Sequence, residues 1–210
     1  MRINREESSR KRLQHLRKQI SDAACNTGAE GRICDAQCVT VCPDCGSTAC
    51  QCRCSADCPV APLLLSSDPE NYPIEPAIMP LVFEMKRLGV FRPCWSCEGH
   101  EAPDGSAWKI PRVWFNSDSE VHVRLLSDGL KDLEIANRLH CPWQVAVTFS
   151  DPDNPETTFS LEPAVTPDAT CELAGLQKDV MTIARLLQDI LNGKARQLQR
   201  TASHALGAAG

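Results

Sequence analysis

The chain has 210 residues, of which 42% are hydrophobic, and a formal net charge of −5. That length allows one hydrophobic core of ordinary size, and the charge gives no overall attraction to nucleic acid or acidic lipid. No stretch approaches the run of about 18 apolar residues that a membrane span needs, and no apolar core follows the charged N-terminus as in a secretory signal. The sequence therefore predicts a cytoplasmic protein without a membrane partner.

Residues 1–24 are predicted to form a basic amphipathic helix. Arginine and lysine dominate the first 20 positions, and apolar residues recur at the three- and four-residue spacing of one helix face at Leu13, Leu16, Ile20 and Ala24. A short basic run is usually a solvated helix face, although it also suits an anionic partner such as RNA or a nucleotide. Both alternatives stay open.

Residues 25–62 form a cysteine-rich segment for which we predict metal binding. Nine of the chain's 13 cysteines fall between positions 25 and 58, with few large apolar side chains among them. Such a segment cannot fold by burial alone, so either bound metal supplies the missing free energy or the segment is disordered. In a reducing compartment, dense thiols indicate metal rather than disulfides. The candidate ligands are Cys38, Cys42, Cys45, Cys50, Cys52, Cys54 and Cys58.

Two motifs within this segment favour different metals. Cys42 and Cys45 enclose CPDCG, the form of a zinc knuckle, in which two thiolates chelate one ion across a tight turn. Together with Cys38 they also make the spacing C-x3-C-x2-C, which resembles the cluster motif of radical S-adenosylmethionine enzymes. That resemblance implies an iron–sulfur cluster, although Asp44 stands where those enzymes have an aromatic residue. Zinc is the predicted cofactor, and an iron–sulfur cluster is the alternative.

Residues 63–200 are predicted to form one α+β domain, with a small mixed or antiparallel sheet and helices on one face. Pro76 suits the start of a helix that ends at Gly89, and VFRPCWSCEGH then continues as an extended segment ending in a turn. PRVWF at 111–115 is a strand candidate. The apolar face of the helix contains Ile78, Leu81, Val82, Met85 and Leu88.

A second helix should follow that strand. Ser117 and Glu120 form a capping box for it, and Gly129 is expected to interrupt it before a short helical piece that reaches Leu139. WQVAVTF at 143–149 alternates as a strand does, and after the DPDNPE turn TTFSL returns as its partner.

A long helix from about 171 to 200 closes the domain, before a tail at 201–210 that we expect to be disordered. Its apolar stripe is most simply the face packed on the sheet, and a homodimer seam through this C-terminal helix is the alternative. The stripe consists of Leu173, Leu176, Val180, Ile183, Leu187 and Ile190.

A second metal site is predicted at CWSCEGH, residues 94–100. Cys94, Cys97 and His100 are spaced three apart around a glycine turn, which suits two sulfurs and one imidazole on zinc. Cys141, with its neighbour His140, would complete four ligands if the following strand begins beside this turn.

The same residues allow a catalytic alternative. A site with only Cys94, Cys97 and His100 leaves a coordination position open to water. The candidate catalytic residues are then Cys97 as nucleophile or ligand, Glu98 as general base, and His100.

The five residues SCEGH at 96–100 resemble a motif that recurs in uncharacterised bacterial proteins. They are more distantly similar to the SCSGR turn of the tRNA wybutosine-synthesis methyltransferase family, which implies an RNA or nucleotide ligand; His100 stands where that family has arginine. The sequence as a whole predicts a zinc-binding cytoplasmic protein of interaction or regulatory type with an unknown protein partner. The alternatives are an enzyme that uses residues 94–100 and an iron–sulfur protein that uses the N-terminal cysteines.

Overall fold

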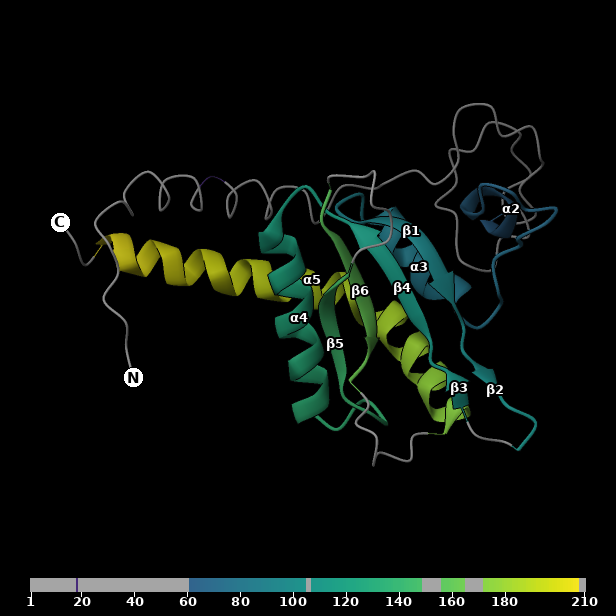
Figure 1. The fold of residues 1–210 in the computed structure, drawn as a ribbon. Coiled ribbons are helices and arrows are strands. Elements are labelled where there is room, and N and C mark those ends of the chain that lie inside the picture. Colours follow the sequence, from purple (N-terminus) through teal and green to yellow (C-terminus); the bar gives the residue numbers. More distant parts are fainter. Residues whose placement is uncertain (1–17, 19–60, 105–106, 149–155, 165–171, 208–210) are drawn as a thin grey trace, which may run out of the picture.

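The computed structural model describes residue 18 and residues 61–104, 107–148, 156–164 and 172–207. Within these ranges, helices pack on a sheet of four strands, and a ribbon of two short strands continues beyond one end of that sheet (Figure 1). The predicted α+β class with antiparallel strands is confirmed. Several predictions concern residues outside these ranges: the basic N-terminal helix, of which only the helical and exposed Lys18 is described, the nine N-terminal cysteines, and the DPDNP residues of the predicted turn.

The helix predicted after Pro76 forms, although it starts later. Helix α3 spans Met79–Arg87 with Pro80 in its first turn, where a missing N–H leaves no hydrogen bond unmade. A short helix, α2 (Ala61–Leu65), packs against it. Gly89 follows with a φ of +69°, a left-handed conformation that glycine adopts without strain. The predicted apolar face is at most 4% exposed, at Ile78, Leu81, Val82, Met85 and Leu88.

The four-stranded sheet has the order β1-β4-β6-β5, and all neighbouring strands are antiparallel. Since β6 lies between β4 and β5, those two strands run parallel, and a helix makes the crossover between them. The strands predicted at 111–115, 143–149 and 157–161 are therefore confirmed over their described residues, and residue 149 lies outside them. The sheet consists of β1 (Arg92–Cys97), β4 (Arg112–Asn116), β5 (Trp143–Thr148) and β6 (Thr158–Pro163).

The crossover helix α4 spans Glu120–Ile135 and begins differently from its prediction. Its N-cap is Ser119, whose hydroxyl oxygen accepts a hydrogen bond from the Val121 N–H at 3.3 Å. The Ser117 hydroxyl instead donates to the Val90 carbonyl at 2.9 Å. The capping box predicted at Ser117 is therefore wrong, because that side chain fixes the chain before the helix.

The expected interruption at Gly129 is also wrong, since α4 continues without a break to Ile135. A Cβ at Gly129 would lie 2.0 Å from the Ile190 Cγ2 atom of the last helix. Gly129 therefore permits α4 and α5 to approach closely. From the sequence pattern alone, a glycine in this role looks the same as one that ends a helix. Leu139, expected in a second helical piece, lies in the loop after α4.

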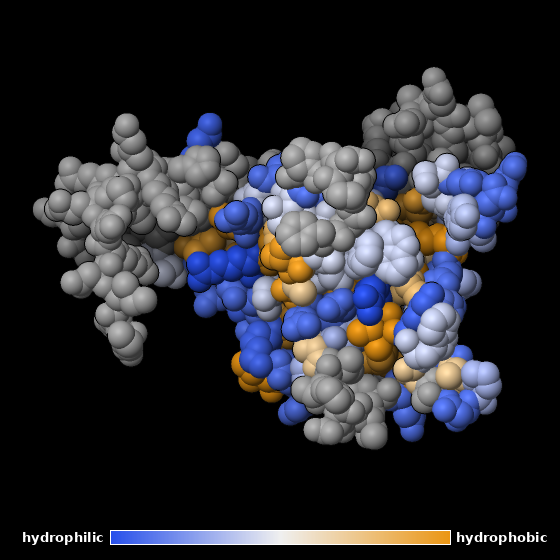
Figure 2. All heavy atoms as spheres, in the orientation of Figure 1, coloured by the Kyte–Doolittle hydropathy of each residue, from blue (hydrophilic) through white to orange (hydrophobic). Residues whose placement is uncertain are grey.

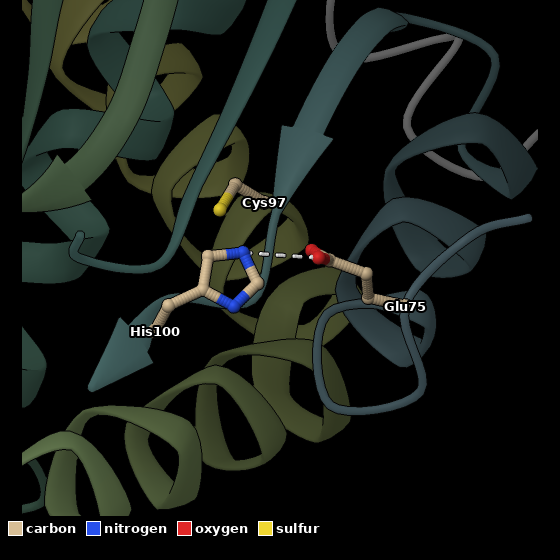
Figure 3. A group of neighbouring side chains, drawn as sticks. All are labelled: Glu75, Cys97 and His100. Carbon is tan, nitrogen blue, oxygen red and sulfur yellow. Dashed lines mark ion pairs between the residues drawn. The ribbon is translucent and has the colours of Figure 1, made fainter. Parts of the chain in front are cut away.

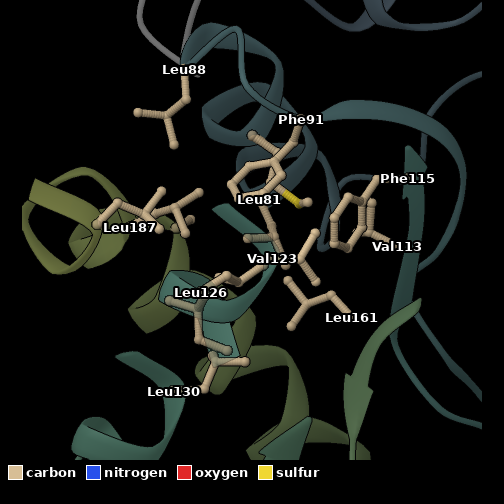
Figure 4. Close-up of a cluster of buried hydrophobic side chains, with 14 of the residues drawn as sticks. Leu81, Leu88, Phe91, Val113, Phe115, Val123, Leu126, Leu130, Leu161 and Leu187 are labelled. Atoms are coloured by element: carbon tan, nitrogen blue, oxygen red, sulfur yellow. The ribbon is translucent and has the colours of Figure 1, made fainter. Parts of the chain in front are cut away.

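The last helix, α5 (Leu173–Gly207), packs across α3 and α4 and runs past its predicted end at residue 200. Val180, Ile183 and Leu187 of its stripe lie in the same core as the sheet and the other helices, and Ile190 packs against that core (Figure 4). Five of the stripe residues are at most 9% exposed: Leu173, Leu176, Val180, Ile183 and Leu187. The side chains on which the homodimer prediction rests are thus packed within one chain.

The visible surface is largely hydrophilic, with hydrophobic residues in separate patches (Figure 2). None of the described helices has an apolar stretch long enough to cross a membrane.

Candidate metal centre

The residues Cys97-Glu98-Gly99-His100 lie where β1 passes into the two-stranded ribbon, which consists of β2 (His100–Glu101) and β3 (Ala107–Lys109). Gly99 has a φ of +84°, in the left-handed region that favours glycine. This turn, called the CEGH turn below, brings the last residue of β1 and the first residue of β2 to the same side, facing Glu75 in the segment before α3 (Figure 3).

Glu75, Cys97 and His100 each place one donor atom within 4.8 Å of the others. The His100 Nε2 atom lies 3.2 Å from Glu75 Oε1, and Figure 3 shows this nitrogen on the side of the ring that faces the Cys97 sulfur. Nitrogen and oxygen donors about 2.1 Å from a tetrahedral zinc ion stand about 3.4 Å apart. The three side chains therefore fit around one ion after small movements.

The site is closed on one side and accessible on the other. Cys97 is only 5% exposed, whereas the side chains of His100 and Glu75 are 38% and 33% exposed. The Trp108 ring of β3 lies beside the imidazole, with 6.2 Å between the ring centroids. The sulfur thus forms the inner wall, and an ion held here would face solvent near the indole.

A reciprocal pair of hydrogen bonds holds the two ligand-bearing segments together. The Glu98 N–H donates to Glu75 Oε2 at 2.6 Å, and the Ala77 N–H donates to Glu98 Oε2 at 2.8 Å. Since one oxygen of Glu75 is fixed in this way, its other oxygen is directed to His100. Glu98, predicted as a general base, has its carboxylate engaged by the backbone and braces the site instead.

Helix α5 supports the turn from behind. A Cβ on Gly99 would lie 2.6 Å from Leu173 Cδ1 and 2.9 Å from Pro111 Cδ, so a larger residue does not fit without movement. Gln177, one turn further along α5, donates from Nε2 to the Glu98 carbonyl at 3.2 Å. Contacts with α5 therefore fix the two middle residues of the turn, Glu98 and Gly99.

Cys94 does not join the group, although it belongs to the predicted C-x2-C pair. Both cysteines lie in the extended strand β1, with Cys94 at the bulge between Pro93 and Trp95, whereas a knuckle needs its two cysteines on a tight turn. Cys94 is exposed and Cys97 is buried. Partial burial of the Cys94 sulfur raises the pKa of this thiol, and a hydrogen bond with its own backbone offsets part of that effect.

Cys141, the predicted fourth ligand, is also elsewhere. It lies two residues before the start of β5, at the sheet edge opposite β1, and is disulfide-bonded. The two other described cysteines, Cys94 and Cys97, are free. This bond differs from the expectation that the cysteines stay reduced. Its neighbour His140 pairs with Asp179 at 2.8 Å rather than with the CEGH turn.

Sequence reasoning missed Glu75 and Asp179. Glu75 lies in a segment with no periodicity, 22 residues before Cys97 in the numbering, and nothing local indicates that its side chain turns toward the ribbon. Asp179 did leave a signal, because an acidic residue between Leu176 and Val180 lies on the predicted buried face of α5. A carboxylate at such a position needs partners of its own.

The geometry suits an ion better than a nucleophile–histidine relay. In a relay the imidazole uses one nitrogen for the thiol and the other for the carboxylate. Here the carboxylate of Glu75 contacts the nitrogen of His100 that also faces Cys97. Sulfur, nitrogen and oxygen donors from these three residue types are a set that zinc accepts.

The ligands predicted between Cys38 and Cys58 lie outside the described residues, and the resemblance of SCEGH to other motifs stays a prediction. The described structure accounts for the glycine of this motif by the positive φ and the contact with α5. No protein-family model, no curated protein and no solved structure matches this chain.

Proposed function

We propose that this chain is a zinc-binding protein of interaction or regulatory type, in which Glu75, Cys97 and His100 hold the ion. The observation that carries the proposal is the convergence of the three donor atoms within 4.8 Å. The hydrogen bond from the Glu98 N–H to Glu75 supports it further, because outer contacts of this kind orient the ligands of metal sites.

The regulatory part of the proposal follows from where the ligands lie in the chain. Glu75 precedes α3, whereas Cys97 and His100 flank the turn into the ribbon. One ion bound to all three would clamp the segment before α3 onto that turn. Since Glu75 and His100 are both about one-third exposed, the clamp would set the shape of a surface that a protein partner contacts.

The test is zinc stoichiometry in the full chain with matched cysteine variants. Cys97→Ser removes a proposed ligand, while Cys94→Ser removes the other cysteine of the same C-x2-C pair. Because the N-terminal cysteines are also predicted ligands, the variants are expected to retain some zinc. The informative quantity is therefore the difference in zinc equivalents per chain between each variant and the parent. We expect Cys97→Ser to lose one equivalent of zinc relative to the parent chain, and Cys94→Ser to lose none.

Two results contradict the proposal. Equal zinc loss in both variants would indicate a knuckle formed by Cys94 and Cys97, and full zinc retention in Cys97→Ser would place all bound metal elsewhere. Glu75→Gln provides an independent check, because it keeps the size of the side chain but removes the charged oxygen donor. We expect this variant to bind zinc at least about 10-fold more weakly, because even the loss of a residue that only orients a metal ligand has an effect of that size.

Catalysis is a second candidate, supported by the accessible side of the site. Three protein ligands leave a fourth position for water, whose pKa a zinc ion lowers to about 7. The carboxylate of Glu98 accepts from the Ala77 N–H, so it does not supply the general base that this reaction class needs. A zinc-dependent esterase assay with p-nitrophenyl acetate, lost in Cys97→Ser, would favour this candidate over the regulatory one.

A further inference from the structure

A second histidine–carboxylate pair lies at His140 and Asp179, separate from the metal centre. Asp179 in α5 is 0% exposed. Its Oδ1 atom accepts from the His140 backbone N–H at 2.8 Å and lies 2.8 Å from His140 Nδ1. Its Oδ2 atom accepts from the Cys141 N–H at 3.1 Å and from Trp143 Nε1 at 3.2 Å. Two donors on each oxygen satisfy a buried carboxylate in its ionised form.

These contacts assign the tautomer of His140. An ionised carboxylate only accepts hydrogen bonds, so the proton of the neutral imidazole lies on Nδ1 and the Nε2 lone pair stays free. The side chain is 54% exposed although its partner is buried, which places Nε2 toward solvent. Among the described residues, Nε2 has no partner.

The ring is also held in place. The His140 backbone N–H and ring share one carboxylate oxygen, and a Cβ added to Gly175 would lie 3.6 Å from the Cβ atom and from two ring carbons, Cγ and Cδ2, of His140. The imidazole thus lies against the first turn of α5 with its free nitrogen outward. A buried carboxylate behind Nδ1 stabilises the positive charge that develops when Nε2 forms a bond.

From this geometry we infer that His140 is a reactive imidazole whose Nε2 atom is a nucleophile toward activated acyl groups, and that Asp179 is its positioning residue. A metal-ligand role is less well supported. Glu75, Cys97 and His100 form the one group of donors able to hold an ion among the described residues, and the neighbouring Cys141 is disulfide-bonded.

The proposed step transfers an acyl group from an activated ester or anhydride. The Nε2 lone pair of His140 forms a bond to the carbonyl carbon, and the bond from that carbon to the leaving oxygen breaks. The leaving group departs with the electron pair, and the proton of Nδ1, held by Asp179 during the attack, is released to it through solvent. Water then hydrolyses the acyl-imidazole and restores the free ring.

Diethyl pyrocarbonate is the probe, since it carbethoxylates nucleophilic imidazoles by this chemistry. The zinc-loaded full chain is treated briefly, and the rate at His140 is measured by peptide mass spectrometry alongside N-acetylhistidine in the same solution. We expect about 10-fold faster modification of His140, the lower end of what an orienting partner contributes. A rate equal to or below that of N-acetylhistidine overturns the proposal.

Two variants separate positioning from general stability. Asp179→Asn removes the charge behind Nδ1, whereas Trp143→Phe removes one hydrogen bond to the opposite oxygen and leaves the His140 contact. With folding checked by circular dichroism, we expect the rate at His140 to fall about 10-fold in the first and to stay unchanged in the second. Equal rates in both variants overturn the positioning role. If Asp179→Asn does not fold, the comparison with N-acetylhistidine decides.

The same measurement in Cys97→Ser distinguishes this inference from the proposed function. His140 should react at the parental rate in that variant, because the metal centre is not part of the pair. A loss of His140 reactivity together with zinc would show that His140 depends on the metal centre and would overturn the inference of a separate site.

Discussion

The two histidine–carboxylate pairs use the imidazole in opposite ways. At the metal centre, the accessible carboxylate of Glu75 contacts His100 at Nε2, the nitrogen that also faces Cys97. At the other pair, the buried Asp179 contacts His140 at Nδ1 and leaves Nε2 toward solvent. At His100, an oxygen, a sulfur and a nitrogen donor gather at one point, which creates a place for a cation. At His140, the hydrogen bond of Nδ1 to Asp179 leaves Nε2 available to a reacting molecule.

Both pairs depend on the first two turns of α5. Leu173 and Gln177 contact the CEGH turn, while Gly175 and Asp179 contact His140. Residues two apart lie on nearly opposite sides of a helix, since each residue turns it by about 100°. The start of α5 therefore separates the two sites and positions each from a different face.

The largest expected difference between the pairs is the loss of stability of the metal-free protein when the carboxylate of each pair is removed. Asp179→Ala leaves several N–H groups in and around the core without their acceptor, and we expect the free energy of unfolding to fall by about 3–5 kcal/mol. Glu75→Ala removes a one-third exposed carboxylate and should cost about 1 kcal/mol or less. Urea denaturation of the metal-free proteins, followed by circular dichroism, measures both values.

Equal losses in these two variants would break the comparison, because they would indicate that Asp179 is no more essential to the core than an accessible side chain. Asp189→Ala, at an exposed position of the same helix, provides the matched control. It should change the free energy of unfolding by less than about 0.5 kcal/mol.

Much of the fold was predictable because its signals are local. The apolar face from Ile78 to Leu88 and the stripe of α5 follow helical spacing, and the alternation in β5 identifies a strand. The errors came from residues whose role depends on a distant partner. Gly129 looks like a break unless Ile190 is known to cross it, and Ser117 looks like a cap unless its bond to Val90 is known.

The candidate site was predictable only in part for the same reason. Cys97 and His100 are neighbours in sequence and remain neighbours in space. The C-x2-C spacing is typical of a metal-binding turn and so predicts Cys94 as a ligand, but both cysteines lie in the extended strand β1 and Cys94 is outside the group of donor atoms. Glu75 comes from a segment whose path depends on the packing of α3 on the sheet, which no local pattern specifies.

The two glycines beside the sites differ in backbone conformation and in the space around them. Gly99→Ala must adopt a φ of +84° and places a Cβ 2.6 Å from Leu173 Cδ1, so we expect a loss of at least about 2 kcal/mol and weaker zinc binding. Gly175→Ala places its Cβ 3.6 Å from His140, an ordinary contact, and gains helix propensity. It should be neutral or stabilise the protein by up to about 1 kcal/mol. Similar destabilisation in both variants would contradict the difference in packing between α5 and the two sites.

The smallest expected effect concerns the two free thiols of β1. Since burial raises the pKa of the Cys94 thiol, less of it is thiolate at pH 8, and iodoacetamide should alkylate it more slowly than free cysteine. The rate should rise as the pH approaches the raised pKa. Zinc should leave this rate unchanged, because Cys94 lies outside the metal centre, and should protect Cys97. Mass spectrometry of both peptides, with and without zinc, measures the two rates in one sample. Protection of both thiols by zinc would contradict the placement of Cys94 outside the metal centre.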